Sequence, residues 1–439
     1  MSADNMSQPI SIFWFRRDLR LSDNAGLYHA LYSGDPVLPV FIFDTDILNE
    51  LEDKQDKRVH FIHNALAAMQ AKLEGMGSTL HVLLGKPLDC FKQLTTEYQI
   101  TAVYTNHDYE PYALQRDREI GIFLNRKNIA FHTFKDQVIF EKDEVVKDNK
   151  EPYTVFTPYS RKWKEKLTDF YLQAYPVEKY FHNFYKQPAK RLFSLDDIGF
   201  KTAPPGTLPA MLDEEIVRHY DTTRDFPAVA GTTRLGVHLR FGTVSIRQLA
   251  ARAQQLNDTF LNELIWREFY MMILWHFPHV VNGCFKKEYD YIAWRNNEQE
   301  FALWCNGQTG YPIVDAGMRE LNETGFMHNR VRMIVASFLT KHLLIDWRWG
   351  EAYFAEKLLD YDLAANNGNW QWAAGCGCDA APYFRIFNPY LQTQKFDAEL
   401  KYIKQWVPEY DQLTYARPLV DHAVARERCL RVYKAALAR

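Results

Sequence analysis

Several features that would place a chain in a class at once are missing from these 439 residues. No apolar run reaches the roughly 18 residues that a membrane-spanning helix needs, and no basic stretch followed by an apolar one marks the N-terminus. Membrane spanning and secretion are therefore not expected. The net charge is −3, so no excess of positive charge indicates nucleic acid, although a local phosphate-binding face is compatible with that balance.

The chain also lacks any Cys-x-x-Cys pair, which argues against the common zinc and redox motifs. Its six cysteines are Cys90, Cys284, Cys305, Cys376, Cys378 and Cys429. Cys376 and Cys378 stand without the further ligands of a zinc site. We expect buried thiols in a reducing environment, no bound metal and a cytoplasmic protein.

Low-complexity runs and internal repeats are absent too, so the chain should be globular almost throughout, with two domains as the expectation for its length. Aromatic residues, in contrast, are abundant, with 25 Tyr, 29 Phe and 11 Trp. Core packing accounts for most of these rings. The same abundance also suits a protein that holds a flat cofactor or unstacked bases.

The first 135 residues alternate short apolar runs with helical patterns, which predicts a parallel α/β sheet covered on both faces. The expected strands are Ile10–Phe15, Val37–Phe43, Thr79–Leu84, Ala102–Thr105 and Ala130–Phe134, and the clearest helices between them are Val59–Met76 and Leu114–Arg126. No Gly-x-Gly-x-x-Gly follows the first strand, so the dinucleotide fingerprint is absent.

Residues 136–210 lose this regularity and are interpreted as a connector with some helix and a turn-rich hinge, Ala203–Pro209. After it, residues 211–439 are predicted to be mainly helical. The strongest helical patterns are Pro158–Tyr175 in the connector, then Phe260–Trp275, Ile313–Glu323 before Gly325, and Met327–Leu344.

Two carboxylates, a run of asparagines and two indoles fall within the thirteen residues Asp360–Trp372, ahead of the segment Ala381–Pro389. Asp360 and Asp362 are two positions apart, so they face the same way only if the backbone there is extended or irregular. Such a pair could belong to a metal site or a general acid-base pair. No histidine cluster supports metal binding, and no nucleophile accompanies them.

A Gly-Thr-Thr turn, Gly231–Gly236, follows the segment Tyr220–Pro227. Its backbone N–H groups and hydroxyls can hold a diphosphate without a formal charge. An ordinary capped loop would explain this motif alone equally well.

Two helical patterns place polar and aromatic side chains on shared faces. Glu263, Trp266 and Arg267 form one such face, for which a simple surface Glu–Arg pair is the alternative. The other consists of Asn329, Arg332 and Met333, opposite the apolar stripe of the same helix.

Taken together and in this order, these motifs resemble the DNA photolyase/cryptochrome family, closest to its class I cyclobutane pyrimidine dimer photolyases. The opening segment Trp14–Arg20, with Asp23 and Asn24, is equally typical of that family. The resemblance covers most of the chain and is weakest between residues 136 and 210. It implies a Rossmann-like antenna-chromophore domain, the connector, and an all-α domain that binds FAD and DNA.

The activity implied is that of a deoxyribodipyrimidine photo-lyase, which transfers an electron from photoexcited reduced FAD to a pyrimidine dimer flipped out of UV-damaged DNA. A monomer is expected. The residues that would contact FAD are Tyr220, Thr232, Thr233, Arg234, Leu235, Gly236, Arg267, Asn329, Arg332, Asp360, Tyr361, Asp362 and Asn366. Arg332 should pair with Asp360, and the amide of Asn366 facing the flavin N5 favours the fully reduced anionic ring.

By the same resemblance, the catalytic set is Glu263, Trp266, Met333 and Asn366. The residues that would contact DNA are Arg224, Glu263, Trp266, Asn329, Arg330, Met333 and Trp372. Within that set Glu263 hydrogen-bonds a flipped base, Trp266 stacks on it and Arg330 binds a phosphate. The residues that match the family's electron-hopping chain are Trp370, Trp347 and Trp294.

The chain departs from the family pattern at a few positions. Gly236 replaces a usual Ser, Phe260 replaces a frequent Trp, and Tyr112–Ala113 replaces the Asn–Glu pair that grips methenyltetrahydrofolate in some members. The antenna chromophore, if present, therefore stays open between a folate, a deazaflavin and FMN. His328 precedes Asn329 where enzymes for the (6-4) photoproduct carry a His pair, which favours the cyclobutane dimer.

Two further functions would use the same flavin site. A cryptochrome-like blue-light photoreceptor is one, although only about thirty residues follow Tyr410 to serve as an effector tail. A non-photochemical flavin electron carrier is the other, and it would have no affinity for damaged DNA.

Overall fold

The computed structural model describes residues 8–202 and 211–438, and within them the chain forms two compact units. The first unit holds the described parts of Met1–Glu141, Leu167–Ala210 and Leu235–Arg252. The second holds Lys142–Lys166, Met211–Arg234 and the described part of Ala253–Arg439. The segments of the two units therefore alternate along the chain, whereas the sequence indicated three consecutive stretches. The expected hinge at residues 203–209 lies outside the described residues.

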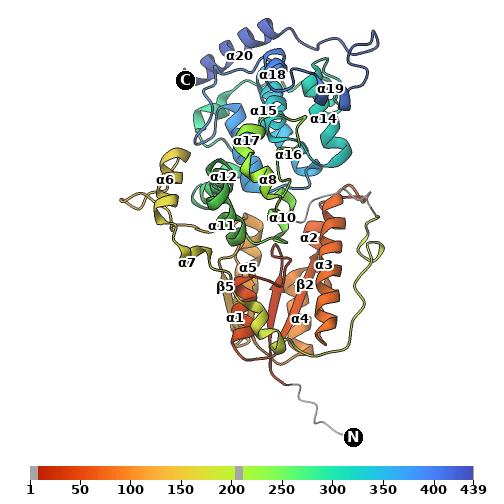
Figure 1. The fold of residues 1–439 in the computed structure, drawn as a ribbon, viewed down its shortest axis with the longest axis vertical. Helices are drawn as coiled ribbons and strands as arrows, with labels where there is room; N and C mark the ends of the chain where they lie inside the picture. The colour runs from red at the N-terminus through yellow and green to blue at the C-terminus, as the bar shows by residue number, and fades with distance from the viewer. Residues whose placement is uncertain (1–7, 203–210, 439) are drawn as a thin grey trace. The chain divides into compact units, whose positions relative to one another are not determined.

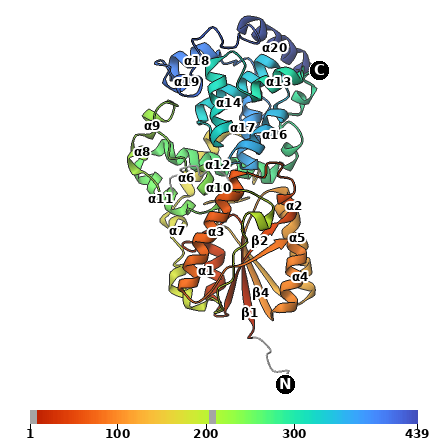
Figure 2. The same ribbon diagram turned by 90° about the vertical axis from the view of Figure 1, so that its right-hand side faces the viewer.

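A five-stranded parallel sheet forms the centre of the first unit, with the strand order β3-β2-β1-β4-β5 (Figure 2). The strands are β1 (Ile10–Phe15), β2 (Val37–Asp44), β3 (His81–Gly85), β4 (Ile100–Asn106) and β5 (Ala130–Phe134). All five strands predicted from apolar runs are present, most of them with ends shifted by one or two residues. The expected Rossmann-like α/β class of this unit is confirmed.

Side chains of alternate residues along β1 cover the two faces of the sheet. Ile12 and Trp14 pack with Phe91 and Leu94 of one helix layer, while Phe13 lies against the opposite layer at Gly26. Figure 2 shows α1 and α3 on one side of the sheet and α4 and α5 on the other. The helical elements of this unit are α1 (Ala25–Tyr32), α2 (Thr45–Leu48), α3 (Lys57–Gly75), α4 (Pro87–Glu97), α5 (Pro111–Arg126), α7 (Asp169–Leu172), the 3-10 turns η1 (Val177–Asn183) and η2 (Asp196–Ile198), α10 (Gly236–Phe241) and the start of α11 (Ile246–Leu256).

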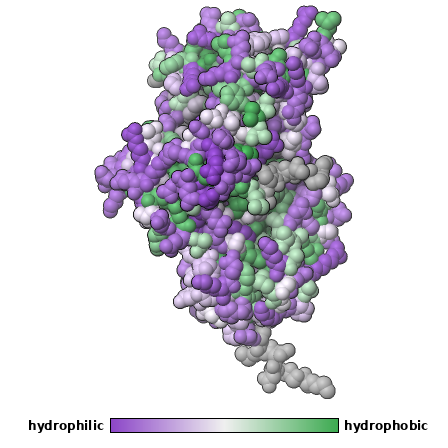
Figure 3. All heavy atoms as spheres, in the orientation of Figure 1, coloured by the Kyte–Doolittle hydropathy of each residue, from purple (hydrophilic) through white to green (hydrophobic). Residues whose placement is uncertain are grey.

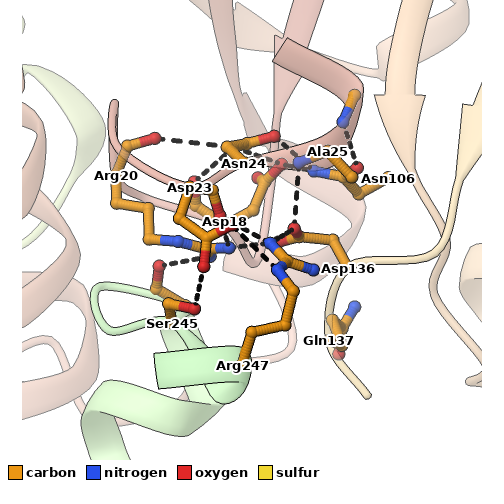
Figure 4. Close-up of polar contacts among 12 residues, drawn as sticks. Asp18, Arg20, Asp23, Asn24, Ala25, Asn106, Asp136, Gln137, Ser245 and Arg247 are labelled. Carbon is orange, nitrogen blue, oxygen red and sulfur yellow. Dashed lines mark hydrogen bonds and ion pairs between the residues drawn. The ribbon is translucent and has the colours of Figure 1, made fainter. Parts of the chain in front are cut away.

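A dry network of charges joins the late segment 235–252 to the sheet (Figure 4). Asp136 accepts hydrogen bonds from Arg20 Nη2 at 2.7 Å and from Arg247 Nη2 at 2.8 Å. Arg247 Nε donates to Asp23 Oδ1 at 2.8 Å, and the Ser245 hydroxyl donates to the other oxygen of Asp23. These pairs, which link residues more than 100 positions apart, explain why the first unit is not one continuous stretch.

The second unit is helical, as expected (Figure 1). Its elements are α6 (Phe156–Lys166), α8 (Glu214–Arg218), α9 (Tyr220–Thr223), the remainder of α11, α12 (Asp258–His276), η3 (Pro278–Val281), η4 (Lys287–Tyr291), α13 (Glu298–Cys305), α14 (Pro312–Thr324), α15 (Asn329–Ser337), η5 (Phe338–Leu343), α16 (Trp347–Lys357), α17 (Leu363–Ala374), α18 (Pro389–Phe396), α19 (Lys401–Trp406) and α20 (His422–Leu437). Gly325, with a φ of 74°, ends α14 as the sequence predicted.

The helix expected over 327–344 is instead shorter, because α15 gives way at Ser337 to the π-helix η5. The wider turn places two successive polar residues in the core, and each finds a partner there. Lys341 Nζ donates to the Ala374 carbonyl at 2.7 Å, and His342 Nε2 shares a hydrogen bond of 2.8 Å with His422 Nδ1. Similarly, the helix expected over 158–175 divides into α6 and α7.

Figure 3 shows a largely hydrophilic surface on which hydrophobic side chains are scattered. Among residues 8–202 and 211–438, none of the helices combines the length and the apolar character that crossing a bilayer requires.

Candidate functional site

One concave pocket in the second unit collects most of the site residues predicted around Asp360. It encloses about 570 Å³ of space when the open solvent at its mouth is included. Its walls come from α15, α16 and α17 and the segment before α17. The predicted residues that line it are Asn329, Arg332, Met333, Asp360, Tyr361, Asp362, Asn366, Trp370 and Trp372.

Two glycines let α17 approach its neighbours closely enough to form this pocket. A Cβ at Gly350 of α16 would lie 2.1 Å from the Trp370 ring, and a Cβ at Gly368 would lie 2.1 Å from the Tyr270 ring of α12. Neither ring could stay in place beside a larger residue. The glycines therefore fix Asn366 and Trp370 of α17 relative to the helices on either side.

The two carboxylates that open the motif have different partners. Asp360 binds Arg332 Nη2 with both oxygens, at 3.1 and 2.9 Å, so the predicted Arg332–Asp360 pair is confirmed. Asp362 caps α17 by accepting from the Ala365 N–H at 3.2 Å. Its backbone is extended, with φ −133° and ψ 124°, and both carboxylates line the same pocket.

Asn366 is held from behind by a half-buried carboxyl group that no sequence motif pointed to. Its Nδ2 donates to Glu351 Oε1 at 2.9 Å and to the Glu351 carbonyl at 3.0 Å. Burial raises the pKa of Glu351, against the hydrogen bond from Asn366. Because the amide nitrogen is committed to Glu351, the amide oxygen is the group that Asn366 can offer to a ligand N–H.

The start of α15 supplies the opposite wall. Asn329, Arg332 and Met333 line the pocket together, as their helical spacing predicted. His328 caps the helix, with its Nδ1 accepting from the Arg330 N–H at 3.2 Å. Burial lowers the pKa of His328 to about 4, so this imidazole is neutral at physiological pH.

A second group of predicted residues lies on α12 and beside α9. Glu263 forms an ion pair with Arg224, whose guanidinium also lies 5.8 Å from the centre of the Tyr220 ring. Burial raises the pKa of Glu263 above its ordinary value, although the charge of Arg224 opposes the shift. Burial likewise raises the pKa of Tyr220, whose ring packs edge-to-face on Phe260 at 5.2 Å.

Arg330 connects this second group to the pocket. Its Nη2 pairs with Asp225 Oδ1 at 2.7 Å, and its Nη1 lies 3.7 Å from the Met333 sulfur. Asp225 follows Arg224 directly in the chain, so the contacts run continuously from Glu263 to a pocket wall. This role of Asp225 was not predicted, although the residue stands inside the motif Tyr220–Pro227.

Trp266 is stacked on one face by an aromatic residue from the expected connector. The Phe156 ring lies parallel to it, with centroids 3.7 Å apart and an angle of 4° between the planes. The Phe156 N–H donates to Asp379 Oδ2 at 3.0 Å, which fixes the start of α6. Arg267 follows Trp266 on α12 and is half-buried.

The Gly-Thr-Thr turn lies against α9, and the pocket-lining residues described above do not include it. Thr233 is buried and Thr232 half-buried, while Arg234 has a φ of 53° and places its guanidinium 4.5 Å from the centre of the Phe326 ring. Leu235 and Gly236 begin α10, so the turn ends where the chain enters the first unit.

The three tryptophans expected to carry electrons belong to one core, but no direct ring contact joins them among the described residues. Trp370 contacts Phe354 and Trp304 instead, with centroids at 5.0 and 6.2 Å. Trp347 is buried, and its indole N–H has no partner in the described parts of the chain. Trp294 is half-buried, with its ring 6.0 Å from that of Tyr433.

Comparison with known families identifies the chain. The family model for the FAD-binding domain of DNA photolyase matches residues 260–414, and the model described as DNA photolyase matches residues 11–179. A deoxyribodipyrimidine photo-lyase from a Synechococcus strain is 38% identical, with 99% of this chain and 98% of that protein covered. The protein belongs to the DNA photolyase family. The expectations of the family, of an enzyme of that family and of an FAD-binding domain are confirmed.

Solved structures agree with this photolyase fold. A bacterial class III photolyase from Agrobacterium tumefaciens has a TM-score of 0.88 at 34% identity, with 100% of this chain and 99% of that chain covered. An archaeal photolyase from Sulfolobus tokodaii with two FAD molecules has a TM-score of 0.79 at 34% identity over 97% and 99%. A Synechocystis cryptochrome has a TM-score of 0.80 at 25% identity over 97% and 99%.

The pocket of this photolyase fits the isoalloxazine of FAD. A flat tricyclic ring needs aromatic and aliphatic walls with a few fixed polar groups at its edge. Trp370, Phe354 and Tyr361 supply walls, and the Arg332–Asp360 pair supplies both a donor and an acceptor. The oxygen of Asn366 adds an acceptor that suits a reduced ring, since reduction adds ring N–H groups.

Proposed function

We propose that the protein repairs cyclobutane pyrimidine dimers in DNA, as a monomer, in a light-dependent reaction that uses reduced FAD. The observation that carries the proposal is the continuity of the site. The pocket that fits a flavin adjoins, through Met333 and Arg330, a group of residues suited to a flipped base and its phosphate. Relatives named deoxyribodipyrimidine photo-lyase over nearly the whole chain support the same conclusion.

Bound FAD would supply the electron that splits the dimer when light is absorbed. The protein would supply binding, orientation and exclusion of water. Arg332 and Asp360 would hold the edge of the ring, and Asn366 would present its amide oxygen to a ring N–H because Glu351 holds its nitrogen. This arrangement favours a reduced flavin ring, which carries a hydrogen on N5, over an oxidised ring, which has no N–H there.

Trp266, whose ring Phe156 holds from one side, would stack on the flipped dimer. Extrusion of a dimer costs less than extrusion of an intact base pair, because the lesion already stacks and pairs badly. Met333 and Trp372, which line the pocket, and Asn329 would complete the contacts with the lesion.

Glu263 would change its protonation state as the lesion enters. In the free protein its pair with Arg224 favours the carboxylate, while burial favours the neutral acid. A base that displaces Arg224 removes the favourable charge and leaves the burial. The carboxyl group then takes up a proton and can donate a hydrogen bond to a pyrimidine carbonyl.

The tryptophans Trp294, Trp347 and Trp370 would pass electrons inward by hopping, from an external reductant at the surface to the flavin, which is thereby reduced. Support comes from their common core and from the position of Trp370 in the pocket wall. The first unit would hold an antenna chromophore. A second pocket of about 680 Å³ there, including its open mouth, is lined by Tyr112 and Arg116. The candidates for this antenna are a folate, a deazaflavin and FMN.

Among the described residues, no observation favours (6-4) repair. His328 is neutral, because burial lowers its pKa to about 4, and its Nδ1 caps α15. A cryptochrome-like role would use the same pocket, and the experiment below separates it from repair.

The test is an assay on a duplex with a single thymine dimer, kept in the dark or exposed to blue light after chemical reduction of the purified flavoprotein. We expect restoration of intact thymines only in the light, with a flavin spectrum in the protein. A flavin-containing protein that changes its absorbance under light but leaves the dimer intact would favour the photoreceptor. A protein without flavin would exclude both.

A further inference from the structure

In the free protein two neighbouring residues, Arg224 and Asp225, form ion pairs with the charged side chains of the proposed DNA site. Arg224 pairs with Glu263, and Asp225 pairs with Arg330 at 2.7 Å. The two ion pairs have opposite polarity, so one dipeptide satisfies an acid on α12 and a base on α15. The side chains of Arg224, Glu263 and Asp225 are 33%, 32% and 39% exposed, so water and a ligand can reach them.

Apart from its exchangeable ion pair with Asp225, Arg330 is held in place by fixed contacts. Its guanidinium lies 4.3 Å from the centre of the Phe396 ring and 3.7 Å from the Met333 sulfur, and its side chain is only 16% exposed. Its Nε is buried without a partner in the described parts of the chain. The exposed carboxylate of Asp225 therefore occupies the accessible side of a fixed guanidinium, where an anion would bind.

We propose that Asp225 is a specificity-determining residue, an internal anion that a DNA phosphate has to displace from Arg330. The inference rests on the proposed function, because it takes Arg330 as a phosphate contact. It goes beyond that function by giving the free protein a built-in competitor for undamaged DNA.

The carboxylate of Asp225 should affect the binding of undamaged and damaged duplexes differently. An intact duplex offers a phosphate to Arg330 but nothing to Glu263, so Arg224 stays paired and keeps Asp225 close to the incoming phosphate. Like charges then repel at short range. A flipped dimer displaces Arg224 from Glu263 as well, which frees the dipeptide and lets Asp225 withdraw. The repulsion by Asp225 therefore lowers the affinity mainly for undamaged DNA.

The experiment compares Asp225→Asn with Asp221→Asn in the full-length holoprotein. Asp221 is exposed on α9 and accepts a hydrogen bond from Asn257 at 2.9 Å, so its variant has the same change in net charge without touching Arg330. Dissociation constants are measured in the dark for a duplex with one thymine dimer and for the same duplex without it, at salt concentrations from about 50 to about 200 mM, the range over which phosphate contacts weaken strongly.

We expect Asp225→Asn to bind undamaged duplex about fivefold more tightly and dimer duplex less than about twofold more tightly, as for the loss of one exposed ion pair. The slope of log K for undamaged duplex against log salt should steepen by about 0.9, the value for one added phosphate contact without an internal competitor. Asp225→Glu, which keeps the carboxylate, should resemble the wild type.

Three results would overturn the proposal: equal behaviour of the Asp225→Asn and Asp221→Asn variants, an unchanged salt slope, or an Asp225→Asn effect that persists when Arg330 is replaced by Gln. Unfolding by urea identifies a variant that has lost its structure, and in that case Asp225→Ser, which also removes the carboxylate, takes the place of Asp225→Asn. If the wild type shows no preference for the dimer duplex, the proposed function fails, and this failure is distinct from that of Asp225.

Discussion

Two sets of ion pairs, one in each unit of the photolyase, differ in their exposure to water. In the first unit Arg20, Arg247, Asp23 and Asp136 are between 1% and 7% exposed, and each carboxylate has several donors (Figure 4). In the second unit the pairs Arg224–Glu263 and Arg330–Asp225 are 16–39% exposed and each acid has one basic partner. Breaking a buried ion pair leaves an unpaired charge away from water and costs much free energy, whereas a half-exposed pair can exchange its partner for water or a ligand at little cost. The first set therefore fixes the fold, and the second is available to a ligand.

Replacing Asp136 by Asn should produce the largest effect, because it leaves two buried guanidinium groups facing a neutral amide. We expect the first unit to lose roughly 3–5 kcal/mol of unfolding free energy. Urea denaturation monitored by circular dichroism measures the change. Asp89→Asn, which breaks the exposed pair with Lys92 in the same unit, should leave the midpoint unchanged. Similar losses for both variants would contradict the distinction.

The stability contributed by Asp136 should also depend on pH. Burial alone would raise the pKa of Asp136, but Arg20, Arg247 and the Ala25 N–H together hold it below its usual value. A depressed carboxyl pKa stabilises the fold above the unfolded pKa of about 4, and that stability is lost as the pH falls through the lower folded pKa. The free-energy difference between wild type and Asp136→Asn should therefore be constant from about pH 5 to about pH 8 and shrink below about pH 4.

Replacing Glu263 by Ala tests the exchangeable set. We expect the repair yield per absorbed photon to fall about tenfold, since a hydrogen-bond donor to the developing charge is lost. Affinity for the dimer duplex should change less than about threefold, because Arg224 is released at the same time. Glu215→Ala, at an exposed position on α8, is the matched control. A yield equal to that of the wild type would remove Glu263 from the mechanism.

The carboxyl of Glu263 should respond to pH in the sense opposite to Asp136. Because burial raises its pKa, its contribution to stability is present below the unfolded pKa of about 4.3 and is lost as the pH rises through the folded value. In Glu263→Gln, this decline of stability above about pH 4.3 should disappear, which urea midpoints from about pH 4 to about pH 8 can show.

The smallest effect is expected from Phe156→Ala, which removes the ring stacked on Trp266. An aromatic pair contributes about 0.5–1.5 kcal/mol beyond its buried area, so affinity for the dimer duplex should fall roughly two- to tenfold. Repair yield at saturating DNA should stay near that of the wild type. Phe170→Ala, which truncates an exposed ring on α7, should bind like the wild type.

Features with a local signal could be predicted from the sequence. Apolar runs located the five strands, Gly325 located the end of α14, and helical spacing placed Asn329, Arg332 and Met333 on one pocket wall. The Arg332–Asp360 pair followed from the family resemblance and was confirmed.

Contacts between distant segments had no such signal. Phe156 on Trp266, Asp225 on Arg330 and Glu351 behind Asn366 each depend on tertiary packing that neither periodicity nor a motif encodes. The alternation of the two units along the chain had no sequence signal for the same reason, because Arg247 contacts Asp136 only in the folded chain. The π-helix η5 was missed because its apolar pattern continues that of α15.

The pairing of Arg247 with Asp23 and Asp136 has a consequence during synthesis. Arg247 lies 224 residues after Asp23 and 111 after Asp136, so a ribosome that adds about 5–20 residues per second delivers it roughly 6–22 seconds after Asp136. Until then Asp136 has Arg20 as its one basic partner, and the carboxylate of Asp23 lacks its guanidinium partner Arg247. The nascent N-terminal half should therefore stay open, exposed to proteases and chaperones, until its late arginine has left the exit tunnel.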